Sequence, residues 1–152
     1  MANGDLLNGD FEFQLHNTLY GRGNGGVYLQ SNKNAVDGIG IPTPKTQDVK
    51  YWGRDGSYGN PDYNDVRIIT ITGFVRDKTG SVATAVTNYK NLLSAWAPIN
   101  ADTDLAFQLG GALKFYVNGR PRGITTDMTN IRAAVIWVLL RFDCLNPTIT
   151  YI

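Results

Sequence analysis

The sequence lacks most of the residues from which catalytic and metal sites are built. Its 152 residues include one cysteine, Cys144, and one histidine, His16. A lone cysteine cannot form a disulfide within the chain, and one Cys with one His cannot complete the ligand set of a structural zinc site. We interpret Cys144 as a small buried hydrophobe. We place His16 at the end of a predicted strand, without a nucleophile motif beside it.

Glutamate and long apolar runs are also scarce. Glu12 is the only glutamate, whereas glycine, asparagine and threonine are abundant. A chain short of strong helix formers and rich in turn and β-tolerant residues is expected to be mainly β. No apolar run is long enough to span a bilayer, and the first residues lack the basic and apolar regions of a signal peptide. We therefore expect synthesis in a cytoplasm.

The charges are nearly balanced. Fourteen basic and thirteen acidic residues give a formal net charge of +1, too little for a protein whose role is to grip nucleic acid. Residues 1–65 carry five basic and eight acidic groups (net −3), and residues 66–152 carry nine and five (net +4). Halves of opposite sign favour head-to-tail contacts between identical subunits.

Alternation of apolar and polar residues predicts the first strands. In residues 10–16, Phe11 and Phe13 fall on one face with Leu15, so this face is expected to be buried. Residues 66–76 form the clearest strand. Weaker strands are predicted near residues 26–30, 36–41 and 47–52.

One helix is predicted, over residues 81–96. Ser81 can cap its first amides and Pro98 ends it. Apolar residues at helical spacing define the side that packs on the sheet: Val82, Ala85, Val86, Tyr89, Leu93 and Trp96.

After the helix the pattern predicts a meander of strands at residues 104–109, 112–117 and 120–126. The joints are Gly110-Gly111 and Asn118-Gly119, both typical of tight hairpin turns. Residues 131–144 are apolar on both parities, which predicts a strand covered on both faces.

Residues 53–64 have the composition of a long loop, with three glycines and a proline. Tyrosine is enriched at protein interfaces, and the segment is followed at once by the clearest strand. We predict a loop that contacts a neighbouring subunit and is poorly ordered in the free subunit. A solvated loop tip without a partner is the alternative. The candidate contact residues are Arg54, Asp55, Tyr58, Asp62 and Tyr63.

Three other motifs have some features of ligand sites. Residues 21–26 match the glycine pattern of dinucleotide folds, but a strand and not a helix is predicted to follow. Acidic residues of the glycine-rich loop could ligate calcium, but the closing glutamate of an EF-hand is absent. The basic residues around position 121 are better explained as a solvated strand edge. The residues concerned are Asp55, Asp62 and Asp65 for calcium, and Lys114, Tyr116, Arg120 and Arg122 for nucleic acid. We expect no cofactor, no metal and no catalysis.

Taken as an ordered series, several segments resemble the N-terminal, ring-forming domain of the distal tail protein of long-tailed, non-contractile phages, also called minor tail protein. The segments are 54–59 (RDGSYG), 67–73 (RIITITG), 92–96 (LLSAW), 115–120 (FYVNGR) and 142–149 (FDCLNPTI). The resemblance implies a β-sandwich or split barrel flanked by one helix. It also implies a hexameric ring that joins the tail tube to the baseplate hub or tip fibres.

The resemblance treats residues 1–152 as a single tail domain that ends near a boundary, since many family members continue into a further domain. It implies that the partners are other copies of the chain, the tail tube protein and hub or tip proteins, with the virion tail tip as the location. Three alternatives remain: a tail tube subunit, a carbohydrate-binding module and, less favoured, a split-barrel flavin enzyme. In the carbohydrate-binding module, Trp52, Tyr58 and Tyr63 would stack on sugars.

Overall fold

A computed structural model describes residues 4–30, 35–41, 66–97 and 100–152, together with four short strands between residues 44 and 64. For those short strands only the backbone pairing is described. No helix among the described residues is long and apolar enough to cross a membrane.

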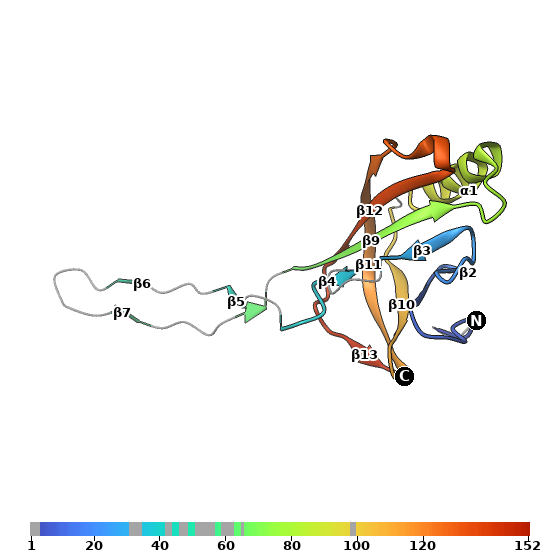
Figure 1. Cartoon of the computed structure of the whole chain (residues 1–152). Helices are drawn as coiled ribbons and strands as arrows, with labels where there is room; N and C mark the ends of the chain where they lie inside the picture. The colour runs from blue at the N-terminus through green and yellow to red at the C-terminus, as the bar shows by residue number, and fades with distance from the viewer. Residues whose placement is uncertain are drawn as a thin grey trace.

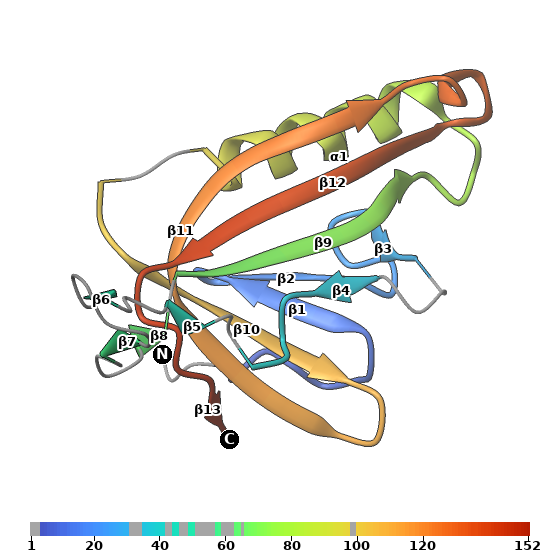
Figure 2. The same cartoon turned by 90° about the vertical axis from the view of Figure 1, so that its left-hand side faces the viewer.

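The chain forms a mainly β structure around one strongly bent sheet, flanked by helix α1 (Val82–Ala95) (Figures 1 and 2). The sheet has nine strands, with the path β2-β1-β10-β11-β12-β9-β3, while β13 pairs with β11 and β4 pairs with β9. The predicted class, a β-sandwich or split barrel with one helix, is confirmed. The strand bounds are β1 Glu12–Leu15, β2 Thr18–Tyr20, β3 Val27–Leu29, β4 Val36–Asp37, β9 Arg67–Arg76, β10 Thr103–Leu109, β11 Leu113–Asp127, β12 Val135–Cys144 and β13 Thr150–Tyr151.

Strand β11 joins the two halves of the sheet. Its residues 113–119 pair with β10, and residues 120–127 pair with β12, with a register shift between Pro121 and Gly123. The prediction of a hairpin turn at Asn118-Gly119 is therefore wrong, because both residues lie inside one continuous strand. Gly119 serves a different purpose, because a Cβ there would collide with the backbone of Asp143. The glycine allows β12 to approach closely, and the chain does not reverse direction there.

The last long strand is shorter than predicted. Residues Ile131–Ala133 form a 3₁₀ turn, and Ala134 takes a left-handed conformation with φ of 58° before β12 begins. Only one face of β12 is buried. Leu139 on the other face is 39% exposed, so the prediction of a strand covered on both faces is wrong.

The core lies between the inner face of the sheet and α1. Ser81 caps the helix as predicted, since its hydroxyl accepts a hydrogen bond from the amide of Thr84. Ala85 and Trp96 are buried as predicted, but Leu92 is buried in place of Leu93, and Val82 is exposed. The core residues are Phe13, Leu15, Tyr20, Val27, Ile69, Ile71, Val75, Leu92, Trp96, Leu105, Phe107, Phe115, Val117, Ile136, Val138, Leu140, Phe142 and Cys144.

Phe11 departs from the alternation that predicts its burial. Its backbone has φ of +63°, and its side chain is 54% exposed. Strand β1 begins only at Glu12, so Phe11 belongs to the turn before it. Phe13 and Leu15 are buried as expected.

Two small sheets precede β9. Strand β5 (Pro44–Lys45) pairs with β8 (Tyr63–Asn64), and β6 (Val49–Lys50) pairs with β7 (Ser57–Tyr58), both antiparallel. In Figure 1 the labels of β6 and β7 lie well away from the nine-stranded sheet. The chain leaves that sheet after β4 and returns to it at β9.

Candidate assembly surface

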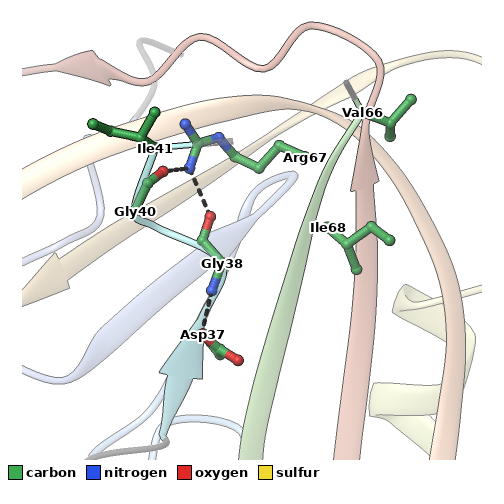
Figure 3. Close-up of a pocket in the computed structure, with 7 residues that line it drawn as sticks. All are labelled: Asp37, Gly38, Gly40, Ile41, Val66, Arg67 and Ile68. Carbon is green, nitrogen blue, oxygen red and sulfur yellow. Dashed lines mark hydrogen bonds between the residues drawn. The ribbon is translucent and has the colours of Figure 1, made fainter. Parts of the chain in front are cut away.

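An open hollow of about 370 Å³ lies where the chain leaves and rejoins the main sheet (Figure 3). It is lined by Asp37, Gly38, Gly40, Ile41, Val66, Arg67 and Ile68. Residues 37–41 come from the end of β4 and the segment after it, and residues 66–68 come from the start of β9. The hollow therefore marks the base from which the segment 42–65 departs.

Arg67 holds this base together through backbone carbonyls. Its Nε donates to the carbonyl of Pro147 at 2.8 Å, and its Nη1 donates to the carbonyls of Gly38 at 2.6 Å and Gly40 at 2.5 Å. The residue is only 6% exposed, and it forms no ion pair with any residue that the structure describes. One buried guanidinium thus joins β9, the segment after β4 and the segment after β12.

Gly38 allows the close packing on which these bonds depend. Its φ is +89°, and an added Cβ would collide with the carbonyl of Ile68. The amide of Gly38 donates to Oδ1 of Asp37 at 2.8 Å, which fixes the turn. A larger residue at position 38 would both strain the backbone and push the turn away from β9.

Large apolar side chains stand at the rim of the hollow. Ile41 is 94% exposed and Ile68 is 44% exposed. Exposed apolar side chains that lie together on a surface are a feature of interaction sites. This rim is the first part of the candidate assembly surface.

The second part is a sheet edge. Residues 123–127 of β11 pair with β12 alone among the described residues, because β10 ends its pairing at Gly119. An unpaired strand edge presents a row of N–H and C=O groups that can accept another strand. The free edge therefore comprises residues 123–127, which follow Pro121 and the register shift beside it.

The predicted contact residues fall mostly outside the described residues. This holds for Arg54, Asp55 and Asp62. Tyr58 pairs with Val49 and Tyr63 pairs with Lys45 along the backbone. Their side chains are not described, so the role of the five residues in contacts stays a prediction. Trp52 and Asp65 also lie outside the described residues.

The remaining sequence candidates have structural roles. His16 lies in the exposed turn after β1, with its Nδ1 3.2 Å from the hydroxyl of Thr103. The glycine pattern at residues 21–26 forms the turn between β2 and β3, and a strand follows it as predicted. Arg120 pairs with Asp102 at 2.5 Å, and Arg122 lies 3.6 Å from Asp143.

Cys144 is buried, as interpreted from the sequence. Burial raises the pKa of its thiol to about 12, against the opposing effect of the Arg67 charge. The group is therefore a protonated core side chain at neutral pH and not a reactive thiolate.

Arg67 is the residue at this base that the sequence analysis did not identify. The alternation in residues 66–76 places it on the same face as Ile69 and Ile71, which are buried. A charged residue on the buried parity of a strand is the signal that could have identified it, because such a group needs partners inside the fold.

The domain thus combines three features. A bent antiparallel sheet is flanked by one helix, hydrogen bonds of Arg67 hold the base of the segment 42–65, and one strand edge is free among the described residues. Solved phage tail structures share the fold. The SPP1 Dit protein, described as a paradigm of the hub adsorption apparatus in phages that infect Gram-positive bacteria, matches 90% of this chain with a TM-score of 0.67 and 15% identity. A chain of the phage p2 baseplate in its activated conformation with Sr matches 92% with a TM-score of 0.63 and 10% identity.

This chain spans about half the length of both structures, 50% and 45% respectively. No family model and no curated protein match the sequence. At these identities the comparison establishes the fold. The fold that the sequence resemblance implies is therefore confirmed.

Proposed function

We propose that this chain is a structural component of a phage tail tip, in which identical copies form a ring, expected to have six members. The ring joins the tail tube to the baseplate hub or tip fibres. The observation that carries this proposal is the fold shared over nine-tenths of the chain with the SPP1 Dit protein and a chain of the phage p2 baseplate. Catalysis forms no part of the proposed role.

The free edge of β11 supports assembly into a ring. Strands β11, β12, β9 and β3 follow one another antiparallel, so the two outer strands of this group run in opposite directions. If copies stand side by side around an axis along the strands, β11 of one copy faces the β3–β4 edge of the next in the antiparallel sense. Head-to-tail contacts of this kind close into a ring when the rotation permits.

The segment 42–65 supplies a further contact in this proposal. Its base is held by Arg67, and its rim carries Ile41 and Ile68. Arg54, Asp55, Tyr58, Asp62 and Tyr63 are the proposed contact residues beyond this base. Apolar burial around Ile41 would then add to backbone pairing at the sheet edge.

Multi-angle light scattering and negative-stain microscopy of the concentrated protein test this proposal. Closed rings of uniform mass are expected. A tail tube subunit, the alternative within the same class, would instead give stacked rings of variable length. A single species of monomer mass at every concentration, together with no ring in the parent tails, would exclude the proposed function.

A further inference from the structure

Residues 6–10 form a strap across the side of β1 that points away from the core cluster. The amide of Leu6 donates to Oε1 of Gln14 at 3.1 Å, and the carbonyl of Leu7 accepts from Nζ of Lys114 at 3.0 Å. Within the part of the chain that the structure describes, every hydrogen bond between this strap and the sheet involves a side chain. Leu7, which is 3% exposed, is its apolar anchor. A segment held in this way can open without breaking the backbone pairing of the sheet.

Glu12, the only glutamate of the chain, holds the strap on β1. Its Oε2 accepts hydrogen bonds from the amides of Asn8 and Gly9, both at 2.9 Å. The residue is only 1% exposed. A carboxylate that is almost fully buried needs donors or a cation for each of its oxygens. The strap supplies the donors for one of the two.

The turn at residues 21–26 serves the other oxygen. Nδ2 of Asn24 lies 3.4 Å from Oε1 of Glu12, and Nη1 of Arg22 lies 3.8 Å from it. The Arg22 guanidinium also lies against Gly9 of the strap, where an added Cβ would collide with it. The strap and the turn therefore share one buried carboxylate and contact each other directly.

The same turn positions the start of β3. The amide of Gly23 donates to the carbonyl of Val27 at 3.0 Å, and the carbonyl of Gly26 accepts from the amide of Arg76 in β9 at 2.8 Å. Strand β3 has only three residues, each paired with β9. A strand this short depends on the turn before it to keep its place in the sheet.

We infer that Glu12 couples the docking of the strap to the order of the turn 21–26 and of β3. If the strap opens, Oε2 loses both amide donors, so the side chain has to turn toward water and away from Asn24. The docked and the open strap are then two states that the turn also senses, which is what coupling between two segments requires.

The consequence concerns assembly. Strand β3 belongs to the edge that is proposed to face β11 of the next copy, so docking of the strap prepares this edge for the contact. This step rests on the proposed function, whereas the coupling between strap and turn is a property of the single subunit.

Hydrogen exchange on the free subunit tests the coupling. Leu7→Ala removes the anchor of the strap and changes no residue of the turn. The amides of residues 8–9 should exchange at least about 10-fold faster, because a buried leucine is truncated. The amides of Asn24 and Gly26, which are bonded within the turn, should accelerate with them. Leu93→Ala, the same substitution at a more exposed position on α1, is the matched control and should change neither set.

Loosening the turn should loosen the strap in return, because coupling between two sites is reciprocal. Asn24→Ala removes the side-chain hydrogen bonds of the turn to Glu12 and Gly21, so the amides of residues 8–9 should exchange faster. Both accelerations should be independent of low urea concentrations, which distinguishes local opening from global unfolding. Exchange that accelerates only in the segment carrying the substitution would overturn the inference.

Light scattering of Leu7→Asp tests the consequence for assembly. A charge at this buried position holds the strap open, so the form competent for assembly becomes a minor population and association should weaken by about 10-fold or more. Leu93→Asp is the control and should assemble like the native chain. Coupled exchange together with unchanged assembly of Leu7→Asp would overturn the assembly role of the strap. A native chain that never forms rings would overturn the proposed function, while coupled exchange in the free subunit would still support the role of Glu12.

Discussion

The indole Nε1 of Trp96 donates a hydrogen bond to the backbone carbonyl of Arg141 at 3.1 Å, which ties the end of α1 to β12. The indole is 1% exposed and makes edge contacts with Phe13 and Phe142. Trp96→Ala should lower the free energy of unfolding by about 3–5 kcal/mol, because it leaves a large cavity. Asn91→Ala on the exposed side of the helix should change it by less than about 0.5 kcal/mol. Equal effects in urea denaturation would contradict this packing.

Arg67→Met should detach the base of the segment 42–65. The substitution keeps an apolar stem but removes three hydrogen bonds from a charged donor, so a loss of at least about 2 kcal/mol is expected. Faster hydrogen exchange at residues 38–41 and 147–149 should accompany it. Arg76→Met, at an exposed position on the same strand, is the control. Unchanged exchange at both segments would show that Arg67 does not join them.

The hydrogen bonds that Asp10 accepts from the amides of Gly111 and Ala112 should weaken in acid. Hydrogen bonds from Ala112, then from Gln108 and Gly111, lower the pKa of Asp10 below its ordinary value, although desolvation opposes them. The stabilisation is therefore present above the unfolded-state pKa of about 3.9 and is lost as the pH falls through the lower folded value. Amides of residues 110–112 should exchange faster in Asp10→Asn at neutral pH, and in the native protein only below about pH 4. Identical exchange in both proteins would show that Asp10 does not hold the tip of the β10–β11 hairpin.

Cys144 should resist thiol reagents in the folded protein. Its pKa of about 12 keeps it protonated, and its burial blocks access. Labelling should thus proceed at the rate of unfolding. Because the folded pKa is raised, the associated stability is complete below the unfolded value of about 8.5 and falls as the pH rises toward 12. Rapid labelling at neutral pH without unfolding would contradict this assignment.

Residues 53–64 are predicted to exchange rapidly in the free subunit and slowly in the assembled particle. Ordering a loop costs about 1–2 kcal/mol per residue in backbone entropy, so contacts with a neighbour must supply the difference. Hydrogen exchange on both states measures this directly. Rapid exchange in both would favour a solvated loop tip without a partner.

Local patterns in the sequence predicted an element best where a single local signal, such as alternation or a helix cap, determined it. Alternation in residues 66–76 predicted the strand β9, and the Ser81 cap predicted the start of α1. Predictions failed where a distant strand decided the outcome. Asn118-Gly119 reads as a turn, but the approach of Asp143 requires that glycine inside a continuous strand.

The candidate assembly surface was harder to predict from the sequence for the same reason. The partners of Arg67 are backbone carbonyls at positions 38, 40 and 147, which no residue type encodes. The exposure of Phe11 follows from its left-handed backbone, set by the lock between Asp10 and the tip at 111–112. The resemblance supplied the fold, which local pattern alone left open among β architectures.

The most direct test of the assembly proposal is cryo-electron microscopy of the parent tails, with this chain located by fitting its nine-stranded sheet. We predict a closed ring of six copies at the tail tip, between the tail tube and the hub or fibres. Its neighbouring copies should meet at the free edge of β11. A single copy in the intact tail, or copies that never contact one another, would contradict the central claim.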